Sequence, residues 1–341
     1  MQKKGKLELT WIGKYDEEKP VAPRILLEDT EKSYGNPSSE NMLIHGDNLI
    51  ALQALQQNFA EKIKCIYIDP PFNTGPAFEN YDDNLEMFIW LNLMKRRLQL
   101  LHSLLRDDGT LFVHIDDSYL PYLTILLDEI FGRSNRLYLV TFKQGSATGH
   151  KAINPGMVTT NFVLVYSKVK AEWNPNRIFT DRGGRDKRYG NYIENIEDNC
   201  ENWRITTSTE AFASSLQVSV KEARVIIKNE PQKIDEFVRD HCESVIQLGN
   251  PDYKSVGATT KEFIDKSNAE PDRIFVQKRD GLSDIILIRG KRIIFYKNKL
   301  KKIDGRYVTG EPLTTLWDDL LSNNLYNEGG VDFPKGKNQR H

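Results

Sequence analysis

The sequence predicts an α/β protein with an incomplete doubly wound, mostly parallel sheet and a second, α+β domain. Between residues 41 and 168, short apolar segments alternate with segments of helical apolar spacing, a pattern typical of parallel sheets covered by helices. Two of the apolar segments end in acidic residues, Asp69 and Asp116. Because ligands of such sheets bind beyond the carboxyl ends of the strands, these two positions are the first candidates for a functional site.

The first predicted unit is a strand, a helix and a second strand. The segment 41–48, NMLIHGDN, predicts a short strand that runs into a turn, and 49–59 repeats apolar residues at helical spacing. The apolar segment 64–69, KCIYID, predicts the next strand. A connection of this kind joins parallel strands, so the region predicts one β-α-β unit. Residues 1–40 are rich in turn formers and charge and are expected to form a loop-like arm.

The next segments repeat this logic, and the pattern then changes. Helices are predicted at 87–105 and 118–132, and strands at 109–116, 135–145 and 161–168. The second domain is expected at 169–312, with helices at 219–229 and 233–246 and with strands joined by tight turns over 273–308. Residues 313–341 are expected to return to the first domain.

The bulk composition limits the class of protein. The 341 residues carry a net charge of −1, so any nucleic-acid surface must be local. No apolar stretch reaches the roughly 20 residues of a membrane span, and the N-terminus lacks the apolar core of a secretory signal. We therefore expect a soluble, cytoplasmic protein without a membrane partner. The cysteines and histidines show no disulfide or metal-ligand spacing, and His45, His102 and His114 are expected to be packed side chains.

The strand at 64–69 ends in Asp69-Pro70-Pro71-Phe72. Prolines carry no N–H group, and their fixed φ stiffens the turn. The Asp69 carboxylate and the Pro70 carbonyl could accept the two N–H groups of a nucleobase amine and so localise its lone pair. Phe72 could stack on a base that is flipped out of a duplex, an interaction worth about 1–3 kcal/mol. The alternative is a plain surface turn, because Asp and Pro both favour turns.

The segment from His45 to Gly75, with RRLQLLHSLLRDDGTLFVHIDD and LLDEIFG, resembles the catalytic half of β-group adenine-specific DNA methyltransferases. It is most similar to the modification subunits of type III restriction–modification systems. The resemblance implies a Rossmann-like methyltransferase part at 41–168 and target recognition by 169–312. It also implies methyl transfer from S-adenosylmethionine to adenine N6, in a single displacement without a metal. Asp69, Pro70, Pro71 and Phe72 would then hold the target adenine.

Three other polar residues near these strand ends are candidates for cofactor contacts, namely Asp47, Asn73 and Thr74. Asp47 has an alternative role as the cap of the helix that begins near Leu49. Asn73 and Thr74 could instead only close the turn. Asp116 is expected to cap the helix that follows it. These assignments are therefore less specific than that of the Asp-Pro-Pro-Phe corner.

A basic run between residues 289 and 306 is the main candidate for DNA binding. It contains eight Lys or Arg residues, one Asp and two aromatic residues, a mixture that suits contact with phosphates and bases. A charge run can also be a solvated face. The loop 181–190, DRGGRDKRYG, is a second candidate. The predicted DNA contacts are Arg289, Lys291, Arg292, Lys297, Lys299, Lys301 and Lys302.

The chain departs from the family pattern at its end. The family is circularly permuted, and its cofactor-binding segment, with a strand ending in Asp-x-Phe-x-Gly-x-Gly, should follow the recognition domain. The sequence ends in FPKGKNQRH without that segment. We expect either a shortened chain, a gene interrupted by a frame shift, or one half of a split methyltransferase.

The expected partners follow from the resemblance and from the missing segment. They are double-stranded DNA, a restriction subunit, and a second methyltransferase chain or another copy at the exposed sheet edge. One alternative function is a catalytically inactive DNA-binding module. Another is an RNA or release-factor methyltransferase with an Asn-Pro-Pro-Tyr corner, against which the leading aspartate and the large second domain argue.

Weak cofactor binding by the isolated chain is a testable consequence. Because the expected cofactor segment is not in the sequence, the 341-residue chain should bind S-adenosylmethionine weakly or not at all. Isothermal titration calorimetry measures this directly, and tight binding by the chain alone would contradict the expectation.

Overall fold

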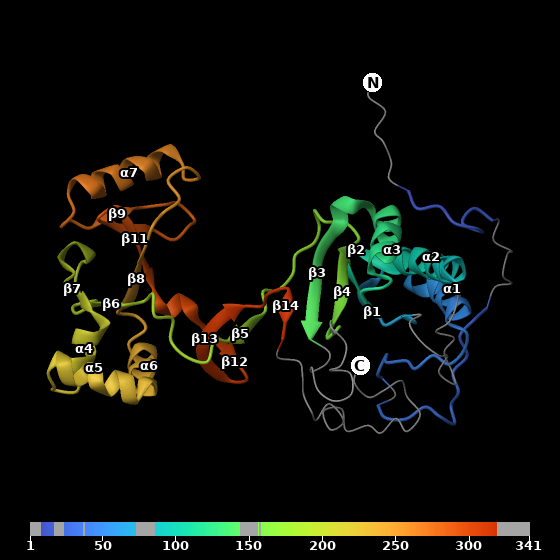
Figure 1. Ribbon diagram of the computed structural model, residues 1–341, viewed down its shortest axis with the longest axis horizontal. Helices are drawn as coiled ribbons and strands as arrows, with labels where there is room; N and C mark the ends of the chain where they lie inside the picture. The colour runs from blue at the N-terminus through green and yellow to red at the C-terminus, as the bar shows by residue number, and fades with distance from the viewer. Residues whose placement is uncertain are drawn as a thin grey trace. The chain divides into compact units, whose positions relative to one another are not determined.

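The computed structural model describes residues 8–16, 24–36, 38–72, 86–143, 156 and 158–318. These residues form two compact units (Figure 1). The first contains the described residues up to 176 together with 314–318, and the second contains 177–313. The domain limits predicted from the sequence, 168 and 312, lie a few residues before these divisions. Each unit is described by itself below.

The first unit is a five-stranded sheet accompanied by helices. The helices are α1 (Asn48–Phe59), α2 (Met87–Leu104) and α3 (Leu120–Leu127), followed by a π-helical turn (Asp128–Gly132) and a 3₁₀ turn (Arg133–Asn135). The strands are β1 (Ile63–Ile68), β2 (Leu105–Ile115), β3 (Arg136–Lys143), β4 (Thr160–Ser167) and β14 (Leu316–Trp317). Their order in the sheet is β1-β2-β4-β3-β14.

The α/β class is therefore confirmed, and the sheet is mixed. Strand β1 pairs with β2, and β3 with β14, in parallel. Strand β4 is antiparallel to both of its neighbours, β2 and β3. The described sheet thus has fewer parallel pairings than the sequence predicted, because β4 lies between β2 and β3 and runs antiparallel to both.

The predicted strand at 41–48 is wrong. Residues 41–47 form no strand in the described structure, and Leu43 is fully exposed. A strand is stabilised by hydrogen bonds to a neighbour, and no described strand pairs with this segment. The helices and strands consequently begin with α1 and β1. The parallel β-α-β arrangement is formed by β1, α2 and β2.

Side chains along strand β2 point alternately to the two faces of the sheet. Leu111, Val113 and Ile115 belong to the main core, which α2, α3 and β4 complete. Phe112 packs on the other side of the sheet, against the valines of β3 and β4. His114 follows Phe112 at the two-residue period of a strand, and so it lies on the side of the sheet away from the main core. β2 begins at Leu105, directly after α2, and therefore earlier than the strand predicted at 109–116.

Residues 8–16 pack against α2 and the π-helical turn although they form no helix or strand. Lys14 is almost completely buried, and its Nζ lies 2.8 Å from Glu129 Oε2. The indole Nε1 of Trp11 donates to Asn92 Oδ1 at 2.8 Å. The described start of the expected arm is thus fixed to the first unit by a buried ion pair and an indole hydrogen bond.

The second unit is an α+β domain with two antiparallel sheets. Its helices are α4 (Ser208–Ser215), α5 (Val220–Asn229), α6 (Pro231–Asp240) and α7 (Ala258–Ala269). One sheet contains β7 (Ile205–Thr207), β6 (Asn191–Ile193), β8 (Val245–Gly249), β11 (Lys291–Phe295), β10 (Ile285–Ile288) and β9 (Phe275–Gln277), in that order. The other contains β12 (Leu300–Ile303), β13 (Arg306–Pro312) and β5 (Phe179–Asp181).

The helices of the second unit begin where the sequence provides capping residues. In α4 the Thr207 side chain and Glu210 form a capping box, and Ser219 and Glu222 do the same for α5. Helices α4, α5 and α6 then bury one apolar cluster around Phe237. Among the described helices of the whole chain, none is long and apolar enough to span a bilayer.

Candidate active site and nucleic-acid interface

The Asp-Pro-Pro-Phe corner lies at the carboxyl end of β1, as predicted. Ile68, the last residue of β1, pairs with Val113 of β2 in parallel register. Asp69 and His114 are the next residues on the two strands, and they leave the same edge of the sheet. Pro70 is buried directly behind the strand end, so the corner is part of the packed unit and is not a solvated surface turn.

Trp90 of α2 fixes the corner from the main core. Its side chain is fully buried, and its indole Nε1 donates to the carbonyl oxygen of Pro71 at 2.8 Å. Pro71 has no N–H group of its own, and its carbonyl is held by this indole. The path of the chain between Asp69 and Phe72 is therefore set by a side chain of α2 as well as by the prolines.

The Asp69 carboxylate meets a buried histidine. His114 Nδ1 lies 3.1 Å from Asp69 Oδ1, and the Asp69 side chain remains 23% exposed against 2% for His114. On the other side of the imidazole, the Asn161 amide Nδ2 lies 3.0 Å from His114 Nε2. Three polar side chains from the neighbouring strands β1, β2 and β4 thus form one row that ends at the carboxylate.

Aromatic rings surround this imidazole. The Phe72 ring meets His114 edge-on, with ring centroids 4.8 Å apart. Phe142 of β3 lies 5.1 Å from the imidazole in a tilted arrangement. Phe72 also packs against the main core. The aromatic residue predicted to stack on a base is therefore positioned by the same histidine that contacts Asp69.

The chain was compared with models of known protein families. Residues 63–337 match the family described as DNA methylase (N6_N4_Mtase). The chain belongs to this DNA methylase family. The match begins with β1 and includes the corner, both units and the return strand β14.

Several curated proteins are similar to this methylase chain. One is the "Probable type III restriction-modification enzyme HindVI Mod subunit" of Haemophilus influenzae, 31% identical over 89% of this chain and 43% of that protein. The EcoP15I Mod subunit of Escherichia coli is 30% identical over 49% of this chain and 32% of its own length. The type II methyltransferase M.EcaI of Enterobacter cloacae is 35% identical over 50% of this chain and 39% of its own length. The chain therefore spans less than half of these relatives.

Two solved structures show weaker similarity to the methylase chain. The PvuII DNA methyltransferase, which is cytosine-N4-specific, is 18% identical over 38% of this chain and 49% of that chain, with a TM-score of 0.29. The M1.HpyAVI–SAM complex is 16% identical over 42% of this chain and 60% of that chain, with a TM-score of 0.28. Similarity at this level does not position individual residues.

The predicted cofactor contacts are only partly described in this methylase. Asp47 is the N-cap of α1, where its Oδ1 accepts hydrogen bonds from the backbone N–H groups of Leu49 and Ile50. Asn73 and Thr74 lie outside the described residues. A cofactor role for these three residues stays a prediction.

Asp116 contributes to the turn before α3 but does not occupy its N-cap position, which is Tyr119. The Asp116 carboxylate accepts a hydrogen bond from the backbone N–H of Tyr119, and burial raises the pKa of Asp116. Asp117 is exposed beside it. Tyr119 is buried against Trp90, with ring centroids 4.8 Å apart.

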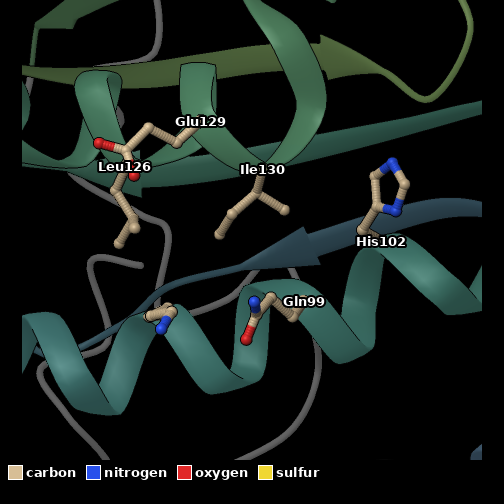
Figure 2. Close-up of a pocket in the computed structure, with 6 residues that line it drawn as sticks. Gln99, His102, Leu126, Glu129 and Ile130 are labelled. Carbon is tan, nitrogen blue, oxygen red and sulfur yellow. The ribbon is translucent and has the colours of Figure 1, made fainter. Parts of the chain in front are cut away.

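A cavity in the first unit lies apart from this row of polar side chains (Figure 2). It is formed by α2 and the end of α3, and Glu129 and Gln99 are among the residues that line it. Glu129 accepts the backbone N–H of Leu9 and pairs with Lys14. Glu129, one of the polar groups of this cavity, thus binds the N-terminal segment 8–16.

The basic run of the methylase divides between two places in the second unit. Arg289, Lys291 and Arg292 lie at the turn between β10 and β11 and at the start of β11. Lys301 and Lys302 lie on β12, in the three-stranded sheet. The two remaining cations, Lys297 and Lys299, lie in the 3₁₀ turn that connects these places. DNA contact by these residues stays a prediction.

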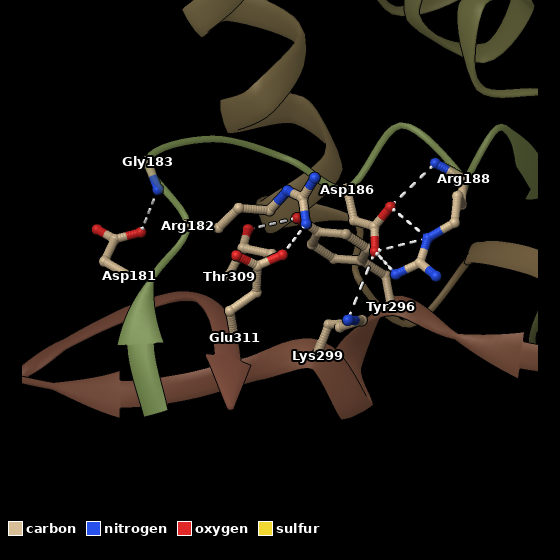
Figure 3. A network of polar contacts seen from close by, with 9 residues as sticks. All are labelled: Asp181, Arg182, Gly183, Asp186, Arg188, Tyr296, Lys299, Thr309 and Glu311. Atoms are coloured by element: carbon tan, nitrogen blue, oxygen red, sulfur yellow. Dashed lines mark hydrogen bonds and ion pairs between the residues drawn. The ribbon is translucent and has the colours of Figure 1, made fainter. Parts of the chain in front are cut away.

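Lys299 takes part in a polar network that fastens the loop 181–188 to the strands (Figure 3). The Asp186 carboxylate is buried and accepts hydrogen bonds from the Arg188 side chain, and its Oδ2 lies 3.5 Å from Lys299 Nζ. The hydrogen bonds from Arg188 hold the pKa of Asp186 well below its usual range. The two basic segments predicted as separate DNA contacts are therefore linked by one buried acid.

Sequence analysis missed His114, Asn161 and Trp90 as parts of the corner. Of the three histidines expected to be packed, His114 is buried, whereas His45 is exposed. The sequence did contain an indication of His114. It lies two residues before Asp116, the second acidic residue at a strand end. No local sequence pattern indicated Asn161, because its position beside His114 depends on the antiparallel register of β4.

Acid should weaken the second unit through Asp186. The pKa of Asp186 is lower in the folded state than in the unfolded chain, so its stabilisation is present above about pH 4 and is lost as the pH falls further. Asp186→Asn should lower the free energy of unfolding at neutral pH by about 1.5–3 kcal/mol and flatten its decline in acid. Denaturant unfolding between neutral and acidic pH measures both effects.

Asp181→Asn is the matched control for this test. Asp181 lies at the start of the same loop, but it is exposed, and its side chain accepts a hydrogen bond from the backbone N–H of Gly183. An equal loss of stability in the two variants would contradict the role given to Asp186.

Proposed function

We propose that this chain is the catalytic and recognition part of an S-adenosylmethionine-dependent DNA methyltransferase that acts on adenine N6 in a restriction–modification system. The observation that carries the proposal is the Asp69-Pro70-Pro71-Phe72 corner at the carboxyl end of β1, in a chain of the DNA methylase family. Similarity to proteins named as type III Mod subunits supports the biological setting. The leading aspartate favours adenine over cytosine.

The corner has the groups that activation of an aromatic amine requires. The lone pair of adenine N6 is delocalised into the ring, so the amine attacks poorly until its N–H groups are bound by acceptors. Asp69 and the Pro70 carbonyl are the two acceptors, and a carboxylate has about four lone-pair sites, enough for both His114 and the amine. As the N6 nitrogen gains the methyl group it loses a proton, for which the Asp69 carboxylate is the proposed acceptor.

The target base must leave the duplex to reach this corner. Phe72 then offers an aromatic ring for stacking, and Trp90 holds the turn in place through Pro71. S-adenosylmethionine supplies the methyl group when bound. The candidates for its contacts are Asp47, Asn73 and Thr74, and the mechanism proposed for this chain concerns the target base alone.

The proposed partners of this chain are based on the same similar proteins. Double-stranded DNA is the proposed substrate. A second methyltransferase chain or another copy of this chain, together with a restriction subunit, are the proposed protein partners. The type III setting of the similar Mod subunits supports the restriction subunit.

Replacing the acceptor of the corner should abolish methyl transfer. Asp69→Ala removes the carboxylate that binds the amine, and we expect at least about a 100-fold lower rate of transfer. Incubation of duplex DNA with labelled S-adenosylmethionine, with and without a candidate second chain, measures the rate. Asp117→Asn, which changes an exposed carboxylate at the neighbouring strand end, should leave the rate unchanged.

The outcomes of this assay distinguish the enzyme from a DNA-binding module. Transfer that depends on Asp69 supports the enzyme. DNA binding without transfer under any of these conditions would support the module, and competition by RNA would support an RNA methyltransferase.

Substitutions in the basic run should weaken DNA binding independently of sequence. Lys291, Arg292 and Lys302 are exposed, and each lost phosphate contact should reduce the slope of log affinity against log salt by about 0.9. Binding titrations of single Gln variants over a range of salt concentrations test this. Lys228→Gln, an exposed lysine of α5 outside the run, is the control, and an unchanged slope in all three variants would remove the run from the interface.

A further inference from the structure

We propose that His114 is a positioning residue that holds the Asp69 carboxylate through a proton on Nδ1, and that Asn161 keeps the imidazole in that orientation. The inference deepens the proposed function, because it concerns the carboxylate that would bind the target amine. It rests on the contacts of three described side chains.

The strand register brings the three residues together. Ile68 pairs with Val113, which places Asp69 next to His114. His114 pairs with Val163 of β4, and Asn161 is two residues before Val163, on the same side of the strand. The row from Asn161 to Asp69 therefore runs from β4 across β2 to the residue after β1, on three hydrogen-bonded strands.

The chemistry of the contacts fixes where the imidazole carries its proton. A neutral imidazole has one N–H donor and one acceptor nitrogen. Nδ1 lies 3.1 Å from Asp69 Oδ1, the distance of an ion pair, and two lone pairs at that distance would repel, so the proposal places a proton on Nδ1. Nε2 then accepts from the Asn161 amide, whose Nδ2 lies 3.0 Å away.

Burial makes this arrangement costly to change. His114 and Asn161 are both buried, and a buried polar group that loses its partner costs about 1–3 kcal/mol. The rings of Phe72 and Phe142 also restrict rotation of the imidazole. The His114 imidazole thus contacts the rings of Phe72 and Phe142, and its Nε2 lies beside the Asn161 amide.

The position of the Asp69 carboxylate determines how it meets the reacting amine. A partly exposed carboxylate can rotate about its side-chain bonds, and a displacement of about 1 Å can reduce a rate by about 100-fold. A fixed donor on one carboxylate oxygen limits that rotation. His114 would therefore affect the rate of transfer, whereas affinity for DNA would depend on other residues.

The first test does not require activity. Nitrogen-15 NMR of the full chain with labelled histidine, assigned with His114→Phe, reports which imidazole nitrogens of His114 carry protons. A proton on Nδ1 at pH 7.5 supports the inference. An unprotonated Nδ1 would overturn it whether or not the chain methylates DNA.

The second test separates donation from packing. His114→Phe keeps a ring between Phe72 and Phe142 but has no donor, whereas His114→Asn places an amide N–H near the position of Nδ1. With the full chain and any second chain that it requires, His114→Phe should lower kcat by about 100-fold with an unchanged KM for DNA. His114→Asn should recover most of that loss.

His102→Phe is the matched control. His102 is a half-buried histidine that packs edge-on against Phe131, and its replacement should leave kcat unchanged. An unaffected His114→Phe variant, or equal losses in His114→Phe and His114→Asn, would overturn the inference. Failure of the wild-type chain to transfer methyl groups would count against the proposed function alone, because the NMR result still decides the place of the proton.

Discussion

The parallel pairing of β1 with β2 is the constraint on which the candidate site depends. Both strands end at the same edge of the sheet, so Asp69 and His114 emerge side by side. The antiparallel strand β4 then brings Asn161 to the same row. Because side chains alternate along a strand, a shift of one residue would turn His114 toward the helices and separate it from the carboxylate.

The sequence was sufficient where local patterns decide the structure. The helix at 87–105, the strands on either side of it and the position of Asp69 at a strand end were all predicted, because apolar spacing and prolines act over a few residues. The strand at 41–48 was predicted wrongly, since an apolar segment becomes a strand only when a neighbour pairs with it. Asn161 could not be predicted for the same reason, because its role depends on register across three strands.

In the second unit, charge along the chain was an incomplete guide to the surface. Lys299 and Lys302 are three residues apart, yet Lys299 is 24% exposed and close to the buried Asp186, while Lys302 is exposed on β12. Sequence shows that a residue is cationic, but not whether the folded chain supplies its counter-ion. The acid that lies close to Lys299 comes from more than a hundred residues earlier, in the loop that the sequence predicted as a second DNA-binding segment.

The bond between Trp90 and Pro71 has a consequence for the hierarchy of local stability in the first unit. Trp90 lies in the first turn of α2 and its indole is fully buried, so opening of the turn after β1 must break a hydrogen bond to the packed core. Many functional turns open at a low free-energy cost, well before the protein unfolds. Here the described part of the turn should open together with the core, and the groups proposed to bind adenine would be preorganised before any nucleotide arrives.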